Sequence, residues 1–509
     1  MAKVTRREFM KTAGGFVAAG TLASQFPELA KAADNKRFNI LFMMTDQHHH
    51  GVLGCAGNPM VKTPNLDKLA ADGAMFTDAI CPTPFCSPTR ASIITGMWPH
   101  THGVVQNVQG EKSALMDDTV ATEQILFDKG YETFQMGKWH LGKTADMRCY
   151  RKDNEKLSQE SHKRYLKGLS ENQWDKARQG EVQVGDVAMM PEMAEFSKAW
   201  TAETNRSAQN LSLIGRQLLK AEHTYESWLA DRCIEQIKKY KDDNFMITWS
   251  VSPPHALWIA PEPYYSMYDP AKMALPSNFD DRPQVYANTQ PGRMGKMMGE
   301  HLLKEYLRCY YAQVSMMDAL VGKILKTLKD EGLDQNTLVV FTSDHGDMQA
   351  GHGVPGKSLQ AFYEEIVRVP LLMRYPKSIK AGTKLRTQVN LVDMMPTLLD
   401  FAGQQVAKGV QGVSIKSLVE GKAAEDDRPA FCERGLGNKG GFSRMIRTKE
   451  WKYGIWADGR RELFDLKNDP GEVTNLADTK PSAMGDLHKR LLAQMEASKD
   501  PALKNAPKA

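Results

Sequence analysis

Cys86 stands in a run of residues that could hold and activate a nucleophile. The run reads C-S-P-T-R from Cys86 to Arg90, and Gly96 follows. Proline suits the first turn of a helix and glycine its end, so a helix is expected to begin at Cys86. The free N–H groups and the dipole at such an N-terminus favour an anion, and Arg90 adds a cation. A buried cysteine that only opens a helix is the alternative.

Two apolar runs, at 38–45 and 337–342, end in residues that could bind a metal or an anion. Continuous apolar runs are typical of strands that are buried on both faces of a sheet. Ligands collect beyond the carboxyl ends of such strands. The polar residues expected at this edge of the sheet are Asp46, Gln47, Asp344 and His345.

Lysine and histidine side chains follow other predicted strands and loops. Lys138 and His140 come after a run at 132–136, and their spacing would place both on one side of an extended segment. His255 follows two prolines, which hold the chain extended and fix where the imidazole points. Lys357 ends a loop that contains several glycines. Taken alone, each residue also fits an ordinary surface loop.

The run C-x-P-x-R followed by T-G resembles the signature of the sulfatase family. Further segments fit the same family in the same order, above all G-K-W-H-L-G at 137–142 and S-D-H-G at 343–346. The resemblance covers nearly all of residues 38–495. It implies that Cys86 is oxidised to formylglycine (3-oxoalanine), whose hydrated form is the nucleophile. One oxygen of the gem-diol would attack sulfur, and the other would later help to expel sulfate.

The resemblance also implies a role for each candidate residue in sulfate transfer. Arg90 would hold the diol and the charge on the metal side, while Lys138 and Lys357 would contact the sulfate. His140 would hydrogen-bond the second diol hydroxyl and assist regeneration of the aldehyde. His255 would lie toward the leaving group, with Lys357 as a competing proton donor. Charge grows on the departing oxygen, so the reaction needs cations and a proton donor, but the sequence does not choose between these two donors.

A divalent cation is implied, with Asp46, Gln47, Asp344 and His345 as its ligands. The commonest family pattern has two successive aspartates at the first strand end and Asp-Asn at the second. This chain departs from it with Asp-Gln and Asp-His, a variant that a subset of related enzymes shares. Glutamine removes one charge, and imidazole suits transition metals better than hard cations. Ca²⁺ is the expected ion, and Mg²⁺ or Mn²⁺ are the alternatives.

Strand and helix patterns alternate over most of the chain and then change. Together with the resemblance, this predicts an α/β fold, alkaline-phosphatase-like, in which helices flank a large mixed sheet, and a smaller C-terminal α+β domain with an antiparallel sheet. The expected domains are a catalytic domain at 33–403, with a variable insertion at 143–224, and the C-terminal domain at 404–509. The predicted strands lie at 38–45, 74–80, 132–136, 245–251, 337–342, 371–375, 442–447, 451–456 and 462–465, and the main helices at 63–71, 86–95, 118–129, 225–239, 300–331, 392–401 and 483–499.

Residues 1–32 are typical of an export signal. The run T-R-R-E-F-M-K matches a twin-arginine motif, a weakly apolar stretch follows, and A-K-A at 30–32 fits a cleavage site. A disordered basic tail is the alternative. The stretch is too short for a spanning helix, so no stable membrane anchor is expected. The twin-arginine translocase and a formylglycine-generating maturation enzyme are the expected partners, and the periplasm or the medium is the expected location.

Composition excludes several classes of protein. Of 509 residues, 41% are hydrophobic and 25% charged, as in ordinary globular proteins. The net charge of +5 falls to +2 without residues 1–32, which argues against a nucleic-acid partner. Seven cysteines without a C-x-x-C pair do not form a disulfide scaffold in a chain of this length.

The sequence therefore predicts an exported sulfatase that hydrolyses sulfate monoesters, with a small-molecule or glycan ester as substrate and sulfated carbohydrates favoured. A phosphonate monoester or phosphodiester hydrolase of the same superfamily is the enzymatic alternative, because it would share the metal and the formylglycine. A non-catalytic binder of sulfated glycans is the other alternative, and it would follow if Cys86 stays unmodified. The natural substrate and the position of its sulfate are not readable from the sequence.

Overall fold

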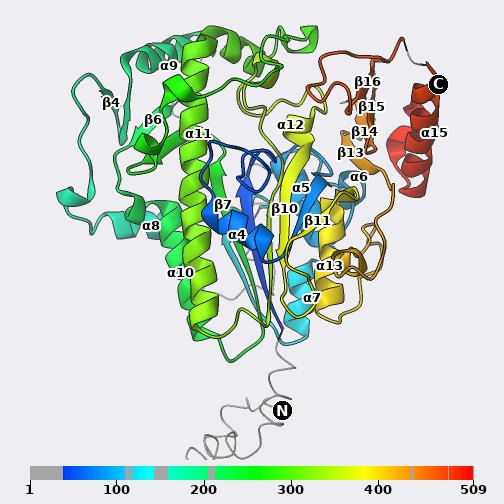
Figure 1. The fold of residues 1–509 in the computed structure, drawn as a ribbon, viewed down its shortest axis with the longest axis horizontal. Helices are drawn as coiled ribbons and strands as arrows, with labels where there is room; N and C mark the ends of the chain where they lie inside the picture. The colour runs from blue at the N-terminus through cyan, green and yellow to red at the C-terminus, as the bar shows by residue number, and fades with distance from the viewer. Residues whose placement is uncertain are drawn as a thin grey trace, which may run out of the picture.

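An eight-stranded mixed sheet carries the larger part of the molecule (Figure 1), in the order β11-β2-β10-β9-β1-β7-β3 with β12 beside β2. The computed structural model describes residues 38–108, 115, 119–142, 159–204, 213–436, 441–479 and 481–507. The strands of this sheet are β1 (Asn39–Asp46), β2 (Ala74–Ile80), β3 (Glu132–Gly137), β7 (Phe245–Pro254), β9 (Thr337–Ser343), β10 (Arg368–Arg374), β11 (Thr383–Leu385) and β12 (Val389–Asn390).

Helices cover both faces of this sheet, which is why its central strands are continuously apolar. All eight residues of β1 are buried: Leu41 and Met43 join the core on one face, and Ile40, Phe42 and Met44 join the core on the other. The first core is completed by α4 (Pro64–Ala71), α10 (Tyr225–Lys239) and α11 (Gln290–Asp330). The second is completed by α5 (Cys86–Thr95), α7 (Thr122–Asp128) and α13 (Met394–Phe401).

Parallel pairing brings the functional strand ends to one edge of the sheet. Strands β3, β7, β1 and β9 are parallel to one another, and β10 runs antiparallel to β9. Thr45 pairs with Ser343, so the next residues, Asp46 and Asp344, lie side by side at one edge of the sheet. Asp46 is the last residue of buried strand β1, and Asp344 directly follows buried strand β9.

The long helix α11 crosses the face of the sheet and is broken once. Gly299 has φ 63° and ψ −178° inside it, and the predicted helix began one residue later. The region predicted as a variable insertion holds more order than its polar sequence indicated. It contains α8 (Gln159–Leu166), β4 (Val182–Val184), β5 (Val187–Met189), α9 (Pro191–Thr204) and β6 (Ile214–Gln217).

Strands β4, β5 and β6 form a separate four-stranded sheet with β8 (Trp258–Pro261). These strands were not predicted, because each has only three or four residues, too few for a period to be recognised. Strand β8 begins three residues after His255 and pairs with β6. The insertion is therefore hydrogen-bonded to the segment that carries this histidine. Residues 143–158 and 205–212, which belong to the predicted insertion, lie outside the described residues, as does the predicted signal at 1–32.

The C-terminal region forms the predicted antiparallel sheet, with one strand more than expected. Its strands are β13 (Ala430–Arg434), β14 (Ser443–Arg447), β15 (Trp451–Trp456) and β16 (Arg461–Asp465), and α15 (Pro481–Ala497) packs on it. Strand β13 was not predicted. The sheet docks on the larger part through Arg447, which donates hydrogen bonds to Glu364 and Asp78 at 2.7 and 2.8 Å.

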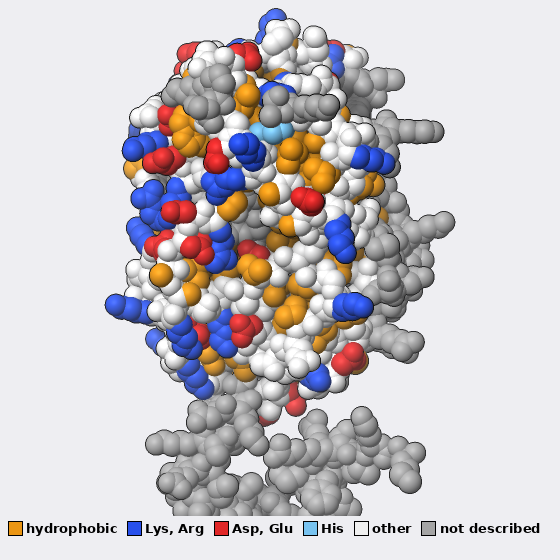
Figure 2. Space-filling model, turned by 90° about the vertical axis from the view of Figure 1, so that its right-hand side faces the viewer, with side chains coloured by type: hydrophobic (Ala, Val, Ile, Leu, Met, Phe, Trp, Pro, Cys, Tyr) orange, Lys and Arg blue, Asp and Glu red, His pale blue; other side chains and the backbone are white. Residues whose placement is uncertain are grey.

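The surface of the C-terminal region is of mixed charge, and the described cysteines are unpaired. In Figure 2, basic and acidic side chains are mixed over the face that carries the C-terminal region. Within the described ranges, no helix is long and apolar enough to cross a membrane. The six cysteines in these ranges are all free thiols, and Cys149 lies outside them.

Candidate active site

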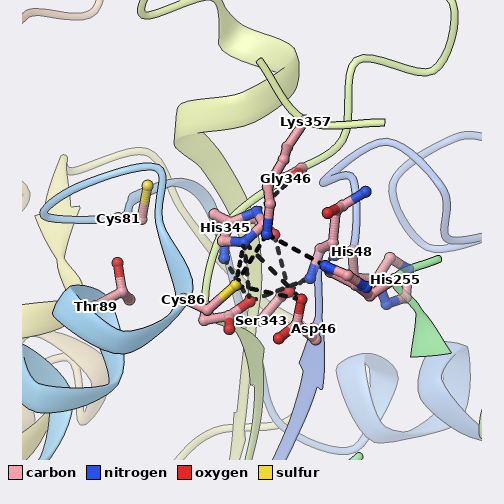
Figure 3. Close-up of polar contacts among 12 residues, drawn as sticks. Asp46, His48, Cys81, Cys86, Thr89, His255, Ser343, His345, Gly346 and Lys357 are labelled. Atoms are coloured by element: carbon pink, nitrogen blue, oxygen red, sulfur yellow. Dashed lines mark hydrogen bonds and ion pairs between the residues drawn. The ribbon is translucent and has the colours of Figure 1, made fainter. Parts of the chain in front are cut away.

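Cys86 is the first residue of α5 and lies at the centre of a polar cluster (Figure 3). The helix ends at Gly96, whose left-handed conformation (φ 64°) confirms the predicted C-terminal stop. The thiol is fully buried. Its Sγ lies 3.1 Å from Lys357 Nζ, 3.2 Å from His345 Nε2 and 3.9 Å from Asp46 Oδ1. A group attached to this residue would therefore meet both cationic and anionic partners.

Arg90, one turn along α5, connects four elements of the sheet edge. Its guanidinium donates to Asp344 Oδ2 at 2.8 Å and to Asp46 Oδ2 at 3.1 Å. Nη1 donates to the carbonyl oxygen of Lys138 at 2.7 Å and to Ser250 Oγ at 2.8 Å. The buried guanidinium thus fixes both carboxylates through their Oδ2 atoms, while Asp344 Oδ1 accepts from the N–H groups of Gln47 and His345 at 3.1 and 3.0 Å. Ser250, in the last part of β7, was not anticipated, and its place near a strand end is the signal that could have found it.

The side chains around Cys86 offer a set of ligand atoms that fits a divalent cation. Asp46, Cys86, Asp344 and His345 each offer one ligand atom, and these four atoms all lie within 4.8 Å of one another. The neighbouring Gln47 has a buried Oε1 that accepts no hydrogen bond from any described residue. Carboxylate and amide oxygens are the ligands that hard cations prefer. The donors present are therefore compatible with Ca²⁺, Mg²⁺ or Mn²⁺.

Charges at this centre strongly shift the pKa of each group. Burial alone would raise the pKa of Asp46, but Lys138, His255, Arg90 and His345 hold it well below its usual range. Burial and the charge of Asp46 raise the pKa of Asp344 to about 6. Two buried carboxylates thus repel one another, and a bound cation would relieve that repulsion. Burial would lower the pKa of His345, but the charges of Asp344 and Cys86 raise it to about 9.

The environment of Cys86 stabilises negative charge. Burial and Asp46 would raise the pKa of the thiol, but Lys357, His345 and Lys138 hold it well below its ordinary value. An anion at this position is therefore favoured by the fixed cations around it. This is what a site for transfer of an anionic group requires.

Lys357 and His255 form a hydrogen-bonded pair beside Cys86, as Figure 3 shows. Lys357 Nζ lies 3.2 Å from His255 Nε2, and His255 Nδ1 lies 2.8 Å from the carbonyl oxygen of Ala256. Since a carbonyl only accepts, Nδ1 carries the proton and Nε2 accepts from the lysine. Burial lowers the pKa of His255 to about 4, so the imidazole is neutral near pH 7.

Lys138 and His140 differ from the expected arrangement. Lys138 Nζ forms an ion pair with Asp46 Oδ2, so the lysine faces the carboxylates. Strand β3 ends at Gly137, and His140 has φ 62°, so the segment is not extended and the prediction from spacing was wrong. The carbonyl oxygen of His140 accepts from Ser87 Oγ at 2.6 Å, next to Cys86. Its Nδ1 is buried and has no partner within the described ranges.

The structure thus gathers the predicted residues at one sheet edge. Those linked to the centre by direct contacts are Asp46, Cys86, Arg90, Lys138, His255, Asp344, His345 and Lys357. Gln47 is connected to these residues through its N–H, which donates to Asp344 Oδ1 at 3.1 Å. His140 is connected to them through its carbonyl oxygen, which accepts from Ser87, the neighbour of Cys86. A buried thiol at a helix N-terminus, several cations and a candidate set of metal ligands thus occupy one site, an arrangement that suits transfer of an anionic group.

Comparison with known proteins gives consistent matches. A model of the sulfatase family matches residues 38–404, and a model described as N-sulphoglucosamine sulphohydrolase, C-terminal, matches residues 352–500. An ulvan-active sulfatase from Formosa agariphila is 30% identical over 445 residues, which are 86% of this chain and 76% of that protein. An N-acetylglucosamine-6-O-sulfatase from Bacteroides thetaiotaomicron is 27% identical in an alignment 498 positions long, which covers 87% of this chain and 83% of that protein.

Solved structures share the fold. A phosphonate monoester hydrolase from Silicibacter pomeroyi superposes with a TM-score of 0.73 at 21% identity, over 93% of this chain and 99% of that one. The predicted α/β fold with a large mixed sheet and a C-terminal antiparallel sheet is confirmed.

Proposed function

The chain belongs to the sulfatase family and is a sulfuric ester hydrolase, and from this premise we propose that it removes sulfate from sulfated carbohydrates. The reaction would use Cys86 in its formylglycine form and a divalent cation. The observation that supports this proposal most directly is the place of Cys86 Sγ, 3.1 Å from Lys357 and 3.9 Å from Asp46. A hydrated aldehyde at this position would have an acceptor for one hydroxyl and a cation beside the other.

Each residue of the site would have a definite task in the reaction. Lys357, and Lys138 on the metal side, would bind the sulfuryl oxygens, and Arg90 would hold both carboxylates in place. His140 would lie close to the diol hydroxyl that is not attacking. When bound, the cation would polarise the sulfate and lower the pKa of the diol. The residues that would hold it are Asp46, Gln47, Asp344 and His345.

Lys357 is the proposed proton donor to the leaving group. The burial of Lys357 would lower its pKa, but Cys86 and Asp46 raise it, so the lysine holds a proton at Nζ. His255 is neutral and accepts from it. We therefore infer that the two residues act together: Lys357 carries the proton, and His255 aligns the ammonium beside the departing oxygen.

Sulfated sugars are the proposed substrate class because of the names that similar proteins carry. One relative is described as active on ulvan, and another as acting on N-acetylglucosamine 6-O-sulfate. We propose in addition that residues 1–32 direct export by the twin-arginine route, and that a maturation enzyme modifies Cys86 before export. A periplasmic or secreted enzyme of this kind would reach sulfated polysaccharides outside the cell.

One experiment tests the central proposal. The full-length chain is expressed with and without a formylglycine-generating enzyme, and sulfate release is measured on a panel of sulfated mono- and disaccharides. The intact mass of the peptide that contains Cys86 reports the modification. We expect release only from the modified protein and none from Cys86→Ala. Equal turnover by modified and unmodified protein would exclude the formylglycine mechanism, and a modified protein that only binds glycans would exclude catalysis.

A phosphonate monoester or phosphodiester hydrolase remains the second candidate. The structural likeness to a phosphonate monoester hydrolase and the Asp46-Gln47, Asp344-His345 set favour it. Paired aryl sulfate and aryl phosphonate esters with the same leaving group separate the two functions. Faster turnover of the phosphonate would replace the sulfatase proposal.

A further inference from the structure

Gln47 occupies a position where the sulfatase pattern has a carboxylate, and its amide contacts a buried carboxylate instead. Gln47 Nε2 donates to Asp347 Oδ2 at 2.7 Å. Because a carboxylate only accepts, the NH₂ group of the amide must face Asp347, and Oε1 must point away from it. This Oε1 is buried and receives no hydrogen bond from the part of the chain that the structure describes.

The rest of Gln47 is held independently of this contact. Its N–H donates to Asp344 Oδ1 at 3.1 Å, and its carbonyl oxygen accepts from Tyr310 Oη at 2.6 Å. The backbone has φ 64°, a left-handed conformation that few side chains adopt. The main chain of Gln47 is therefore fixed beside the candidate metal ligands. The orientation of its side-chain amide is set by the hydrogen bond to Asp347.

Asp347 is itself fixed, because three donors converge on its other oxygen. Oδ1 accepts from Tyr306 Oη, from Gln349 N at 2.8 Å and from Gln349 Nε2 at 3.0 Å. Tyr306 belongs to α11, and its ring packs edge-on against Trp258 with 4.6 Å between the centroids. Oδ1 is thus committed to three donors, which leaves Oδ2 for Gln47.

We propose that Asp347 is a positioning residue of the metal site, which turns the carbonyl oxygen of Gln47 toward the cation. The inference rests on the metal site of the proposed function. This role explains the departure from the commonest family pattern. Gln47 lacks the negative charge of the second aspartate in that pattern, and Asp347, which accepts a hydrogen bond from Gln47, supplies a negative charge instead. A carboxylate that accepts from a ligand also makes that ligand more basic, so the charge still contributes to cation binding.

The geometry predicts what the isosteric change Asp347→Asn does. The three donors at Oδ1 hold the carbonyl oxygen of the new amide there, so its NH₂ group replaces Oδ2. Two NH₂ groups cannot face each other, and the amide of Gln47 must turn over. Its NH₂ group then points to the cation. Adding Gln47→Glu repairs the site, because one glutamate oxygen accepts from the new amide and the other faces the cation.

The test is a double-mutant cycle in the full-length protein. Wild type, Gln47→Glu, Asp347→Asn and the double variant are stripped with a chelator, and Ca²⁺ binding is measured by calorimetry. Asp347→Asn is expected to weaken Ca²⁺ binding about 10–100-fold. Adding Gln47→Glu to Asp347→Asn is expected to restore most of this affinity. Tyr306→Phe is the matched control, because it removes one donor from Oδ1 and leaves the Gln47 contact in place, so its effect should be smaller.

The outcomes separate this inference from the metal site itself. The thermal stability of each apo-protein is also measured. If Asp347 had a purely structural role, both variants that carry Asp347→Asn would be less stable, and adding Gln47→Glu would not restore the affinity for Ca²⁺. If Asp347→Asn binds Ca²⁺ like wild type, or the double variant binds no better than Asp347→Asn, the inference is wrong. If the wild type binds none of Ca²⁺, Mg²⁺ or Mn²⁺, the proposed metal site fails and this inference fails with it.

Discussion

Lys357 Nζ and His255 Nε2 lie 3.2 Å apart, and the lysine is the donor. The sequence left these two residues as competing proton donors to the leaving group. In the structure they form one unit, because the Nδ1 proton of His255 is used by Ala256 and its Nε2 accepts from Lys357. A neutral imidazole protonated at Nδ1 has no proton at Nε2, so in this pair the proton between the two side chains belongs to Lys357.

Replacing Lys357 with alanine should slow hydrolysis most for substrates with poor leaving groups. General acid catalysis contributes about 10²–10⁴-fold, so a loss of this size is expected on alkyl or sugar sulfates and a smaller one on 4-nitrophenyl sulfate. The double variant with His255→Ala should be no slower than Lys357→Ala alone, because the two residues act as a unit. Rates on both substrate classes are the measurement. Lys68→Ala, at an exposed lysine paired with Asp72, is the control. Equal losses on both classes would contradict the assignment.

Arg90→Ala should destabilise the fold as well as the site. The change leaves the buried carboxylates of Asp46 and Asp344 without their shared guanidinium. Removing one partner of a buried ion pair reduces the free energy of unfolding by about 3–5 kcal/mol. Chemical denaturation measures this loss. Arg90→Lys should not recover it, because one ammonium cannot reach all four acceptors of the guanidinium. Wild-type stability in Arg90→Lys would refute this interpretation.

Removing the cation should lower thermal stability, and adding it back should restore it. Ca²⁺ at about a hundredfold excess over its dissociation constant would stabilise the folded state by about 2.7 kcal/mol, because only the folded chain assembles the ligands. Thermal unfolding of chelator-treated protein, with increasing Ca²⁺, Mg²⁺ or Mn²⁺, measures the effect and ranks the ions. Asp344→Ala removes a proposed ligand, and this variant should show no rise in thermal stability. A rise of equal size in that variant would place the ion elsewhere.

Two histidines after the signature helix should give opposite pH dependences of stability. Burial would lower the pKa of His100, but its hydrogen bond to Glu433, 2.7 Å long, raises it above the ordinary value of 6.5. A raised pKa in the folded state stabilises the protein below pH 6.5, and this stabilisation is lost as the pH rises through the folded value. The difference in unfolding free energy between wild type and His100→Gln should therefore be largest below pH 6.5.

His102 provides the matched comparison. Burial lowers its pKa to about 3, so it stays neutral in the folded protein and destabilises the fold as the pH falls from 6.5 toward 3. Relative to wild type, His102→Gln should lose less stability in acid. Denaturation curves between pH 4 and 8 test both variants. The same pH slope in both variants would show that these histidines do not account for the dependence.

Much of the fold could be predicted because its signals are local. An apolar run such as β1 needs burial on both faces, and the start of α5 at Cys86 follows from the proline and glycine around it. The errors arose where local signals are weak. The strands of the insertion are short, and His140 was assigned an extended backbone that its positive φ contradicts.

By itself, the sequence determined the family signature, the longer strands of the large sheet, such as β1 and β9, and the side chains at their ends. Only the tertiary structure decided how these groups interact. Gln47 and Asp347 meet across 300 positions, and Arg90 reaches Asp344 across 254. Such contacts depend on the register of β1 against β9 and on the placement of helices over them. The protonation of His255 depends on burial and on neighbouring charges, which exist only once the chain has packed.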